Sequence, residues 1–122
     1  MSMNSDIIMA LSTVNLPKQT GMYTGTPQPD GTIVHELNYI VLTPLGERNE
    51  DIADDKDLTE TEEMDVNLYY VGNYLAVKNQ IKTLLKSAGF FISDSNYIEV
   101  LKISDGVYQH HYVFTVEKKT IL

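Results

Sequence analysis

The sequence predicts an α+β fold, in which a mostly antiparallel β-sheet has two helices packed on one face and ends in a C-terminal β-hairpin. Three observations lead to this expectation. Two segments place apolar residues at helical spacing, several others are rich in β-branched and aromatic residues, and a tight turn joins the last two of these. The chain has 122 residues, the size of one domain, so we expect residues 1–122 to share one core.

The first predicted element is a short helix from Asp6 to Val14. Ser5 precedes it and can cap its start, and Leu16-Pro17 lies just beyond its end. The apolar residues that follow helical spacing are Ile7, Ile8, Ala10, Leu11 and Val14.

Two strands separated by a loop are expected next. The segment from Lys18 to Thr24 predicts a short strand. Gly25 to Gly31 holds two prolines and two glycines in seven residues, which indicates an exposed loop without regular structure. Thr32 to Thr43 is rich in β-branched and aromatic residues and predicts a long strand that ends at Pro44.

The segment that follows is strongly acidic. Residues 47–65 contain ten of the 17 acidic residues, and their only basic residues are Arg48 and Lys56. The net charge of this segment is therefore −8, the same as that of the whole chain. Clustered like charges repel one another, and we therefore expect a flexible acidic loop over 46–64. A calcium-binding EF-hand loop needs a glycine at its sharp turn, and none lies between Gly46 and Gly72, so no dedicated metal site is expected.

A strand, a helix and a hairpin complete the prediction. Asp65 to Val71 alternates, with Val66, Leu68 and Tyr70 on one side. Asn73 can cap a helix over Tyr74 to Ala88, and Gly89 stands at its C-cap position. The segments Tyr97 to Ile103 and Val107 to Lys118 are strand-like, and Ser104-Asp105-Gly106 joins them as a hairpin.

The composition argues against several classes of protein. Without cysteine there is neither a disulfide framework nor a cysteine zinc site, which fits a reducing compartment. No segment approaches the roughly 18 consecutive apolar residues of a membrane span. The segment up to Val14 has no basic residue, so we expect no signal peptide and synthesis in a cytoplasm.

No group of residues in the sequence predicts catalysis. His110 and His111 are neighbours on a strand and should point to opposite faces, so they cannot act as a pair. His35 lies beside Glu36, but no nucleophile, zinc-protease or phosphate-loop motif is present. We therefore expect no enzyme activity and no cofactor.

Two groups of residues are candidates for an interface, either with a second copy of the chain or with another protein of the same assembly. Lys78, Lys82 and Lys86 recur every four residues and form a stripe on the predicted helix. The stripe is either the solvated face of an amphipathic helix or a surface that meets acidic residues. Tyr69, Tyr70 and Tyr74 cluster where the strand leads into the helix, and they either pack internally or form an interface.

The order of these elements resembles the small tail terminator (tail completion) proteins of long-tailed bacteriophages. The resemblance covers about Met3 to Lys118. It rests on the opening helix with L-P-K-Q-T-G-M-Y-T-G-T-P-Q-P, the strand L-N-Y-I-V-L-T-P, the segment D-V-N-L-Y-Y-V-G-N-Y with the helix L-A-V-K-N-Q-I-K-T-L-L-K-S-A-G-F, and the hairpin D-G-V-Y-Q-H-H-Y-V-F-T-V-E.

The resemblance implies a structural protein of the virion, located at the joint between tail and head. Such proteins form a ring, typically a hexamer, that caps the head-proximal end of the tail tube and ends its polymerisation. The implied partners are further copies of the chain, the major tail tube protein and the head–tail connector protein. DNA passes through the ring without specific binding, and no membrane, catalytic residue or cofactor is involved.

The acidic residues are candidates for the lumen of such a ring or for a loop that faces the tube. Carboxylates in a lumen would repel the phosphates and let DNA slide. These residues are Glu47, Glu50, Asp51, Asp54, Asp55, Asp57, Glu60, Glu62 and Glu63. An acidic inhibitor that mimics DNA, or another phage neck or head-completion protein, remains an alternative at this stage.

Overall fold

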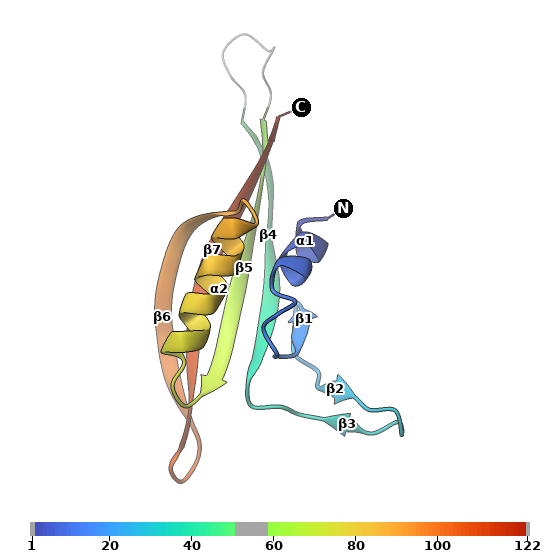
Figure 1. The fold of residues 1–122 in the computed structure, drawn as a ribbon, viewed down its shortest axis with the longest axis vertical. Helices are drawn as coiled ribbons and strands as arrows, with labels where there is room; N and C mark the ends of the chain where they lie inside the picture. Colours follow the sequence, from blue (N-terminus) through green and yellow to red (C-terminus); the bar gives the residue numbers. More distant parts are fainter. Residues whose placement is uncertain (1, 51–58, 122) are drawn as a thin grey trace.

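The computed structural model describes residues 2–50 and 59–121. Within them the fold is α+β, as predicted: two helices lie on a five-stranded, mostly antiparallel sheet that ends in the hairpin β6–β7 (Figure 1). The elements are, in chain order, α1 (Met3–Ala10), β1 (Lys18–Thr20), β2 (Thr26–Pro27), β3 (Ile33–Val34), β4 (Tyr39–Glu50), β5 (Thr59–Val71), α2 (Leu75–Ser87), β6 (Phe91–Ser104) and β7 (Val107–Ile121).

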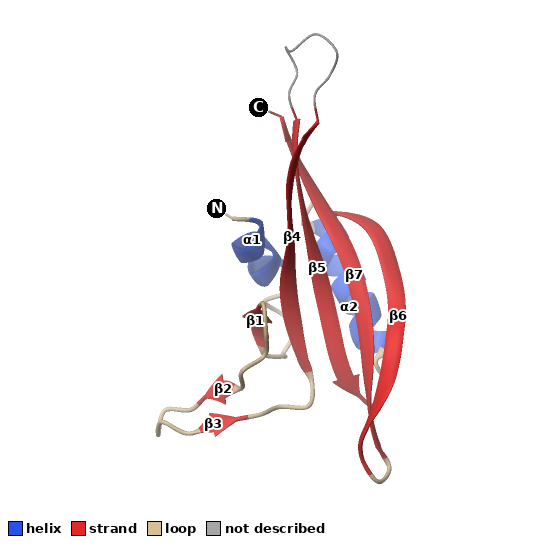
Figure 2. Ribbon diagram, turned by 180° about the vertical axis from the view of Figure 1, so that it is seen from behind, coloured by secondary structure: helices blue, strands red, loops and turns tan. Residues whose placement is uncertain are grey.

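The sheet has the strand order β1-β4-β5-β7-β6. All its neighbouring strands are antiparallel except the short β1, which runs parallel to β4 over residues 40–42. The sheet therefore has two unlike edges, formed by β6 on one side and by β1 and the rest of β4 on the other. A separate two-stranded arm, β2–β3, projects sideways from the β1 side (Figures 1 and 2).

Both helices cover the same face of the sheet, and the core lies between them and the strands (Figure 2). The predicted alternation in β5 is confirmed, since Val66 and Leu68 are fully buried on this face. Phe114 of β7 is the largest side chain that is fully buried. Neither of the two described helices lies over the opposite face of the sheet, which we call the open face.

The first helix lies earlier in the chain than predicted. It starts at Met3, with the side chain of Ser2 accepting a hydrogen bond from the Ser5 amide, and it ends at Ala10 rather than Val14. The apolar spacing continues past Ala10 because Leu11 and Val14 are also buried, in a turn where the Val14 amide donates to the Leu11 carbonyl. Apolar spacing alone thus did not distinguish the helix from the turn that follows it.

The predicted long strand from Thr32 to Thr43 is interrupted, and Pro44 does not end it. The two-residue β3 is followed by an irregular stretch, and β4 then runs from Tyr39 through Pro44. The register with β5 shifts between Pro44 and Gly46, and beyond Leu42 no described strand lies on the outer side of β4. A sheet tolerates proline at such an edge or bulge.

The predicted loop from Gly25 to Gly31 is partly wrong, because Thr26 and Pro27 form β2 and pair with β3. Gly25 is buried rather than exposed. A Cβ atom at Gly25 would clash with Cγ2 of Ile33, so the close approach of the two segments requires glycine here.

The predicted flexible loop over 46–64 is wrong for residues 46–50 and 59–64. These residues belong to the antiparallel pair β4–β5, while residues 51–58 lie outside the described part of the chain. β5 is held on both sides, by β4 and by β7. Lys118 and Lys119 of β7 stand opposite Glu62 and Thr61, so the neighbouring strand places two positive charges beside the acidic residues of β5.

Candidate functional site

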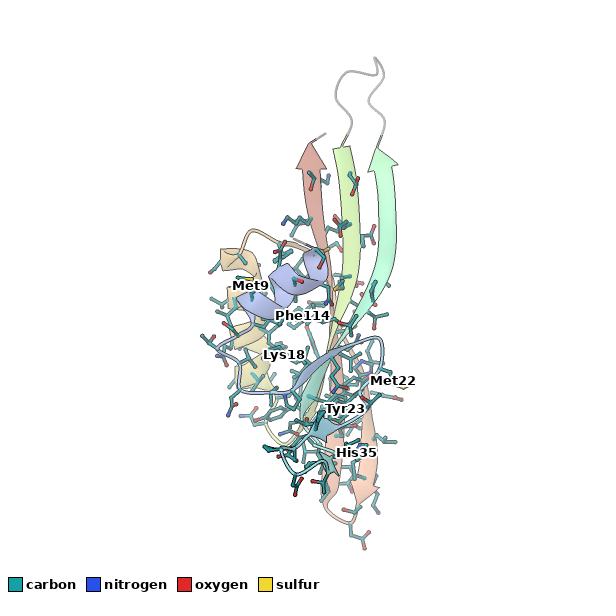
Figure 3. All side chains as sticks on the ribbon, turned by 90° about the vertical axis from the view of Figure 1, so that its right-hand side faces the viewer. Met9, Lys18, Met22, Tyr23, His35 and Phe114 are labelled. Atoms are coloured by element: carbon teal, nitrogen blue, oxygen red, sulfur yellow. The ribbon has the colours of Figure 1, made fainter. Side chains whose placement is uncertain are left out.

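A row of stacked rings crosses the open face of the sheet. It consists of Tyr23, Tyr39, Tyr69 and His111, with successive ring centroids 4.0, 4.8 and 4.2 Å apart. The register produces this row, because Tyr39 of β4 pairs with Tyr69 of β5, which pairs with His111 of β7. Tyr23 follows β1 and extends the row beyond the sheet edge (Figure 3). All four rings are half-buried, so part of each remains exposed, and for Tyr39 and Tyr69, which are stacked on both sides, this part is the ring edge.

Two rings of this row, His111 and Tyr69, have pKa values shifted by burial, and His111 is also hydrogen-bonded. Nε2 of His111 lies 2.9 Å from Oδ1 of Asn67, whose amide nitrogen donates to the Val41 carbonyl and to Oγ1 of Thr43. Burial lowers the pKa of His111, and the charge of Glu99 partly opposes this shift. Burial also raises the pKa of Tyr69, with Tyr39 and Glu99 adding to the effect.

A hollow of about 360 Å³ lies beside the row. Its lining consists of Gly21, Met22, Tyr23, Tyr39, Val41 and Tyr69. Met22 is 69% exposed at its rim (Figure 3). The hollow and the row together form a neutral surface of aromatic and apolar atoms, which suits packing against another protein.

The three tyrosines that the sequence groups together lie on two different faces. Tyr69 belongs to the open-face row, whereas Tyr70 and Tyr74 pack against the core on the helix side. Tyr74 contacts His110, and the hydroxyl of Tyr97 lies 2.9 Å from Nδ1 of His110. The prediction that His110 and His111 point to opposite faces is confirmed by these contacts.

The lysine stripe divides into one packed and two free side chains. Nζ of Lys78 lies 5.0 Å above the ring of Tyr112, in a cation–π contact. Lys82 and Lys86 are exposed and border a hollow of about 340 Å³, which we call the α2–β6 notch. The rest of its lining comes from β6 and consists of Ile92, Ser93, Asp94 and Ser95. Neither Lys82 nor Lys86 forms an ion pair with another residue in the described ranges.

The structure describes the side chains of only some of the predicted acidic residues. Glu60 and Glu62 are half-buried in β5 and share a face with Met64 of the core, whereas Glu63 points to the opposite face. Glu47 and Glu50 are residues of strand β4, but the structure does not describe the placement of their side chains. Asp51, Asp54, Asp55 and Asp57 lie outside the described residues altogether.

Sequence reasoning missed the apolar surface of the β6–β7 hairpin. Near the turn these strands expose large apolar side chains, 40 to 55% exposed, on both faces: Tyr97, Ile98, Val100, Leu101, Ile103 and Tyr108. The signal was available in Y-I-E-V-L-K-I, which lacks the strict alternation of a strand with one wet face. The register with β7 shifts three times along β6, and these bulges bend the strand.

The β2–β3 arm exposes a second apolar surface, at the other edge of the sheet. Met22, Ile33, Val34 and Leu37 are all more than 40% exposed there. Two strands of two residues each cannot stabilise themselves in water. Exposed apolar side chains that lie together in this way are typical of protein-interaction surfaces.

Three further findings bear on the class of protein. In the ranges that the structure describes, no three His, Cys, Asp or Glu side chains are placed to hold a metal ion together. None of the described helices is long and apolar enough to span a membrane. A comparison with protein-family models and with curated proteins finds no match to this sequence.

Proposed function

We propose that this chain is a structural phage protein that caps the head-proximal end of the tail tube as a ring and forms the joint to the head connector. The observation that carries the proposal is the pair of unlike sheet edges. One edge has the apolar β6 strand and the α2–β6 notch, and the other has the projecting β2–β3 arm and the acidic β4–β5 hairpin. A head-to-tail ring needs two different patches on each copy.

The amount of exposed apolar surface supports a protein that acts through contacts with other proteins. Monomeric proteins rarely expose large contiguous apolar patches. Here the β6–β7 hairpin and the β2–β3 arm lie on opposite sides of the sheet (Figures 1 and 2). Both expose large apolar side chains. In the proposed ring, both surfaces are covered by neighbouring copies.

The open-face row provides a third surface, which we assign to the tail tube or to the connector. It is neutral and aromatic, and it lies on the face that α1 and α2 leave free. The acidic hairpin then concentrates negative charge at one level of the ring. Negative charge there would keep DNA from binding as it passes, because DNA is held by basic contacts.

Polymerisation of tail tubes tests this function. Purified tube protein of the phage that carries this gene is polymerised with increasing amounts of the chain, and tube lengths are measured by electron microscopy. A cap shortens the tubes in proportion to its concentration and stops growth at one end. Unchanged lengths, with no chain bound to the tubes, would contradict the proposal.

A second candidate function is an acidic inhibitor that mimics DNA. It is favoured by one observation: Glu60 and Glu62 lie on a rigid strand, at a fixed spacing, rather than in a loop. Competition with double-stranded DNA for a nuclease of the host tests it. A mimic inhibits the nuclease and leaves tube length unchanged, whereas a cap does the opposite.

A further inference from the structure

The lysine side chains of this protein differ in whether they have partners in their own chain. Lys118 pairs with Asp6 at 2.9 Å, Lys102 pairs with Asp105 at 3.1 Å, and Lys78 lies over Tyr112. Lys82 and Lys86 have no such partner among the described residues. The α2–β6 notch is therefore a hollow with two positive charges that have no such partner and one carboxylate, Asp94. Asp94 accepts hydrogen bonds from the Ser95 amide and the Asn96 side chain.

The acidic hairpin, formed by β4 and β5, carries an excess of negative charge. Its sequence from Glu47 to Glu63 carries nine carboxylates against Arg48 and Lys56. Among the described residues, Glu60 and Glu62 lie on β5, and Glu62 stands opposite Lys118 of β7. The first residue of β6, Phe91, stands opposite Glu117 of β7. Glu60 and Glu62 therefore lie in the part of the sheet that extends past the start of β6. Strand β7 with its own lysines separates these carboxylates from the notch of the same chain.

The two charged surfaces belong to opposite edges of the sheet. The notch is formed with β6, the last strand on one side. The hairpin includes β4, whose outer side has no described strand beyond Leu42. One molecule thus presents a hollow with two unpaired lysines at one edge and an acidic hairpin at the other, with Glu60 and Glu62 on β5, one strand in from that edge. Two copies placed edge to edge would bring the hairpin of one copy toward the notch of the other.

We propose that the α2–β6 notch binds the acidic β4–β5 hairpin of a second copy of this chain, through Lys82 and Lys86. The inference rests on the proposed ring and assigns the charged part of its copy-to-copy contact. Charge complementarity selects this occupant, because the chain itself carries the matching acidic excess. Opposite charges at such a contact speed association and fix which edge meets which.

Reversal of the charges tests the contact. Sedimentation velocity of the full-length chain at low and high salt compares the wild type with Lys82→Glu/Lys86→Glu and with Glu60→Lys/Glu62→Lys. We expect each double variant to self-associate roughly tenfold more weakly than the wild type at low salt, because exposed ion pairs contribute modestly and are screened by ions. High salt should remove most of the difference between the variants and the wild type.

The most informative measurement is the association of a mixture of the two double variants. The reversed notch of one variant faces lysines on the hairpin of the other, so the mixture should associate more tightly than either variant alone. This gain also requires both variants to be folded. Lys82→Arg/Lys86→Arg is the control, since it keeps both positive charges of the notch, and its self-association should equal that of the wild type.

The possible failures are distinguishable. A wild type that stays monomeric at low salt, or double variants that self-associate as the wild type does, would overturn the notch contact. If the notch variants nevertheless cap tail tubes as the wild type does, the proposed function stands without this contact. If the wild type itself leaves tube length unchanged, the proposed function fails.

Discussion

At the scale of single residues, neighbours along one strand contribute to different surfaces. Tyr69 and His111 form the open-face row, while Tyr70 and His110 lie next to them in the chain and contact the helix side. The side-chain period of two in a β-strand enforces this division. A substitution at one of these positions should therefore affect one surface and leave the other intact.

Phe114 should be the most sensitive position for stability. It is fully buried in the centre of β7, and Phe114→Ala should lower the free energy of unfolding by about 3–5 kcal/mol through lost burial and the cavity left behind. Urea denaturation followed by circular dichroism measures this. Tyr108→Ala on the same strand is the matched control, because Tyr108 is 47% exposed. Equal losses for both variants would contradict the described core.

His111 should make stability depend on pH. Its pKa is lowered by burial below the ordinary value of 6.5, so the unfolded chain takes up a proton at higher pH than the folded one. This contribution is fully present above pH 6.5 and is lost as the pH falls through the pKa of the folded state. His111→Gln, which does not titrate, should show a smaller loss of unfolding free energy between about pH 8 and about pH 5. Parallel curves for variant and wild type would refute this.

At the scale of elements, the sequence predicted the types of element better than their ends. The helix α2 was predicted within a residue at each end, because its apolar spacing, Asn73 and Gly89 agree. The Asn73 side chain accepts a hydrogen bond from the Leu75 amide, although the cap residue itself is Tyr74. Pro44 and the acidic residues misled the prediction because local preferences indicated a break, whereas pairing with β5 and β7 overrides them.

For the candidate surfaces, the sequence likewise predicted local features but not contacts between elements. Helical spacing was enough to place Lys82 and Lys86 on one side of α2. It could not show that β6 lies beside them, because this contact depends on the bulged path of β6 after the chain has left the helix. Likewise, the stacking of Tyr23 on Tyr39 joins residues of different elements, and only the fold brings them together.

Hydrogen exchange tests the extended β4–β5 pair directly. The amides of β5 from Glu60 to Met64 lie in a central strand, so we expect them to exchange slowly in the free protein. The amides of β3, in the short arm, provide the comparison and should exchange rapidly. Rapid exchange over Glu60 to Met64 would indicate that this segment is a loop in solution.

At the scale of the whole molecule, the exposed apolar side chains should matter for assembly and not for folding. Leu101 is 55% exposed near the turn of the β6–β7 hairpin. Leu101→Asp should leave the melting temperature of the monomer within a few degrees of the wild type, since surface substitutions usually change stability by about 0.5 kcal/mol or less. It should weaken self-association in sedimentation velocity. Unchanged association would show that this hairpin lies outside the copy-to-copy contact.

The proposed capping role requires several contact surfaces on each copy. Each copy must join two neighbours through unlike edges and still offer a face to the tube. The β6 edge, the β4 edge with the β2–β3 arm, and the open-face row provide three such surfaces on one sheet. A head-to-tail contact between the two edges gives a closed ring if its rotation closes, and an open filament if it does not.

The most direct measurement is electron microscopy of tail tubes polymerised in the presence of this chain, with the chain labelled by antibody or gold. We expect one ring of label at a single end of each tube, and tubes so marked should not lengthen when more tube protein is added. Label along the tube wall, label at neither end, or continued growth from the labelled end would contradict the capping role.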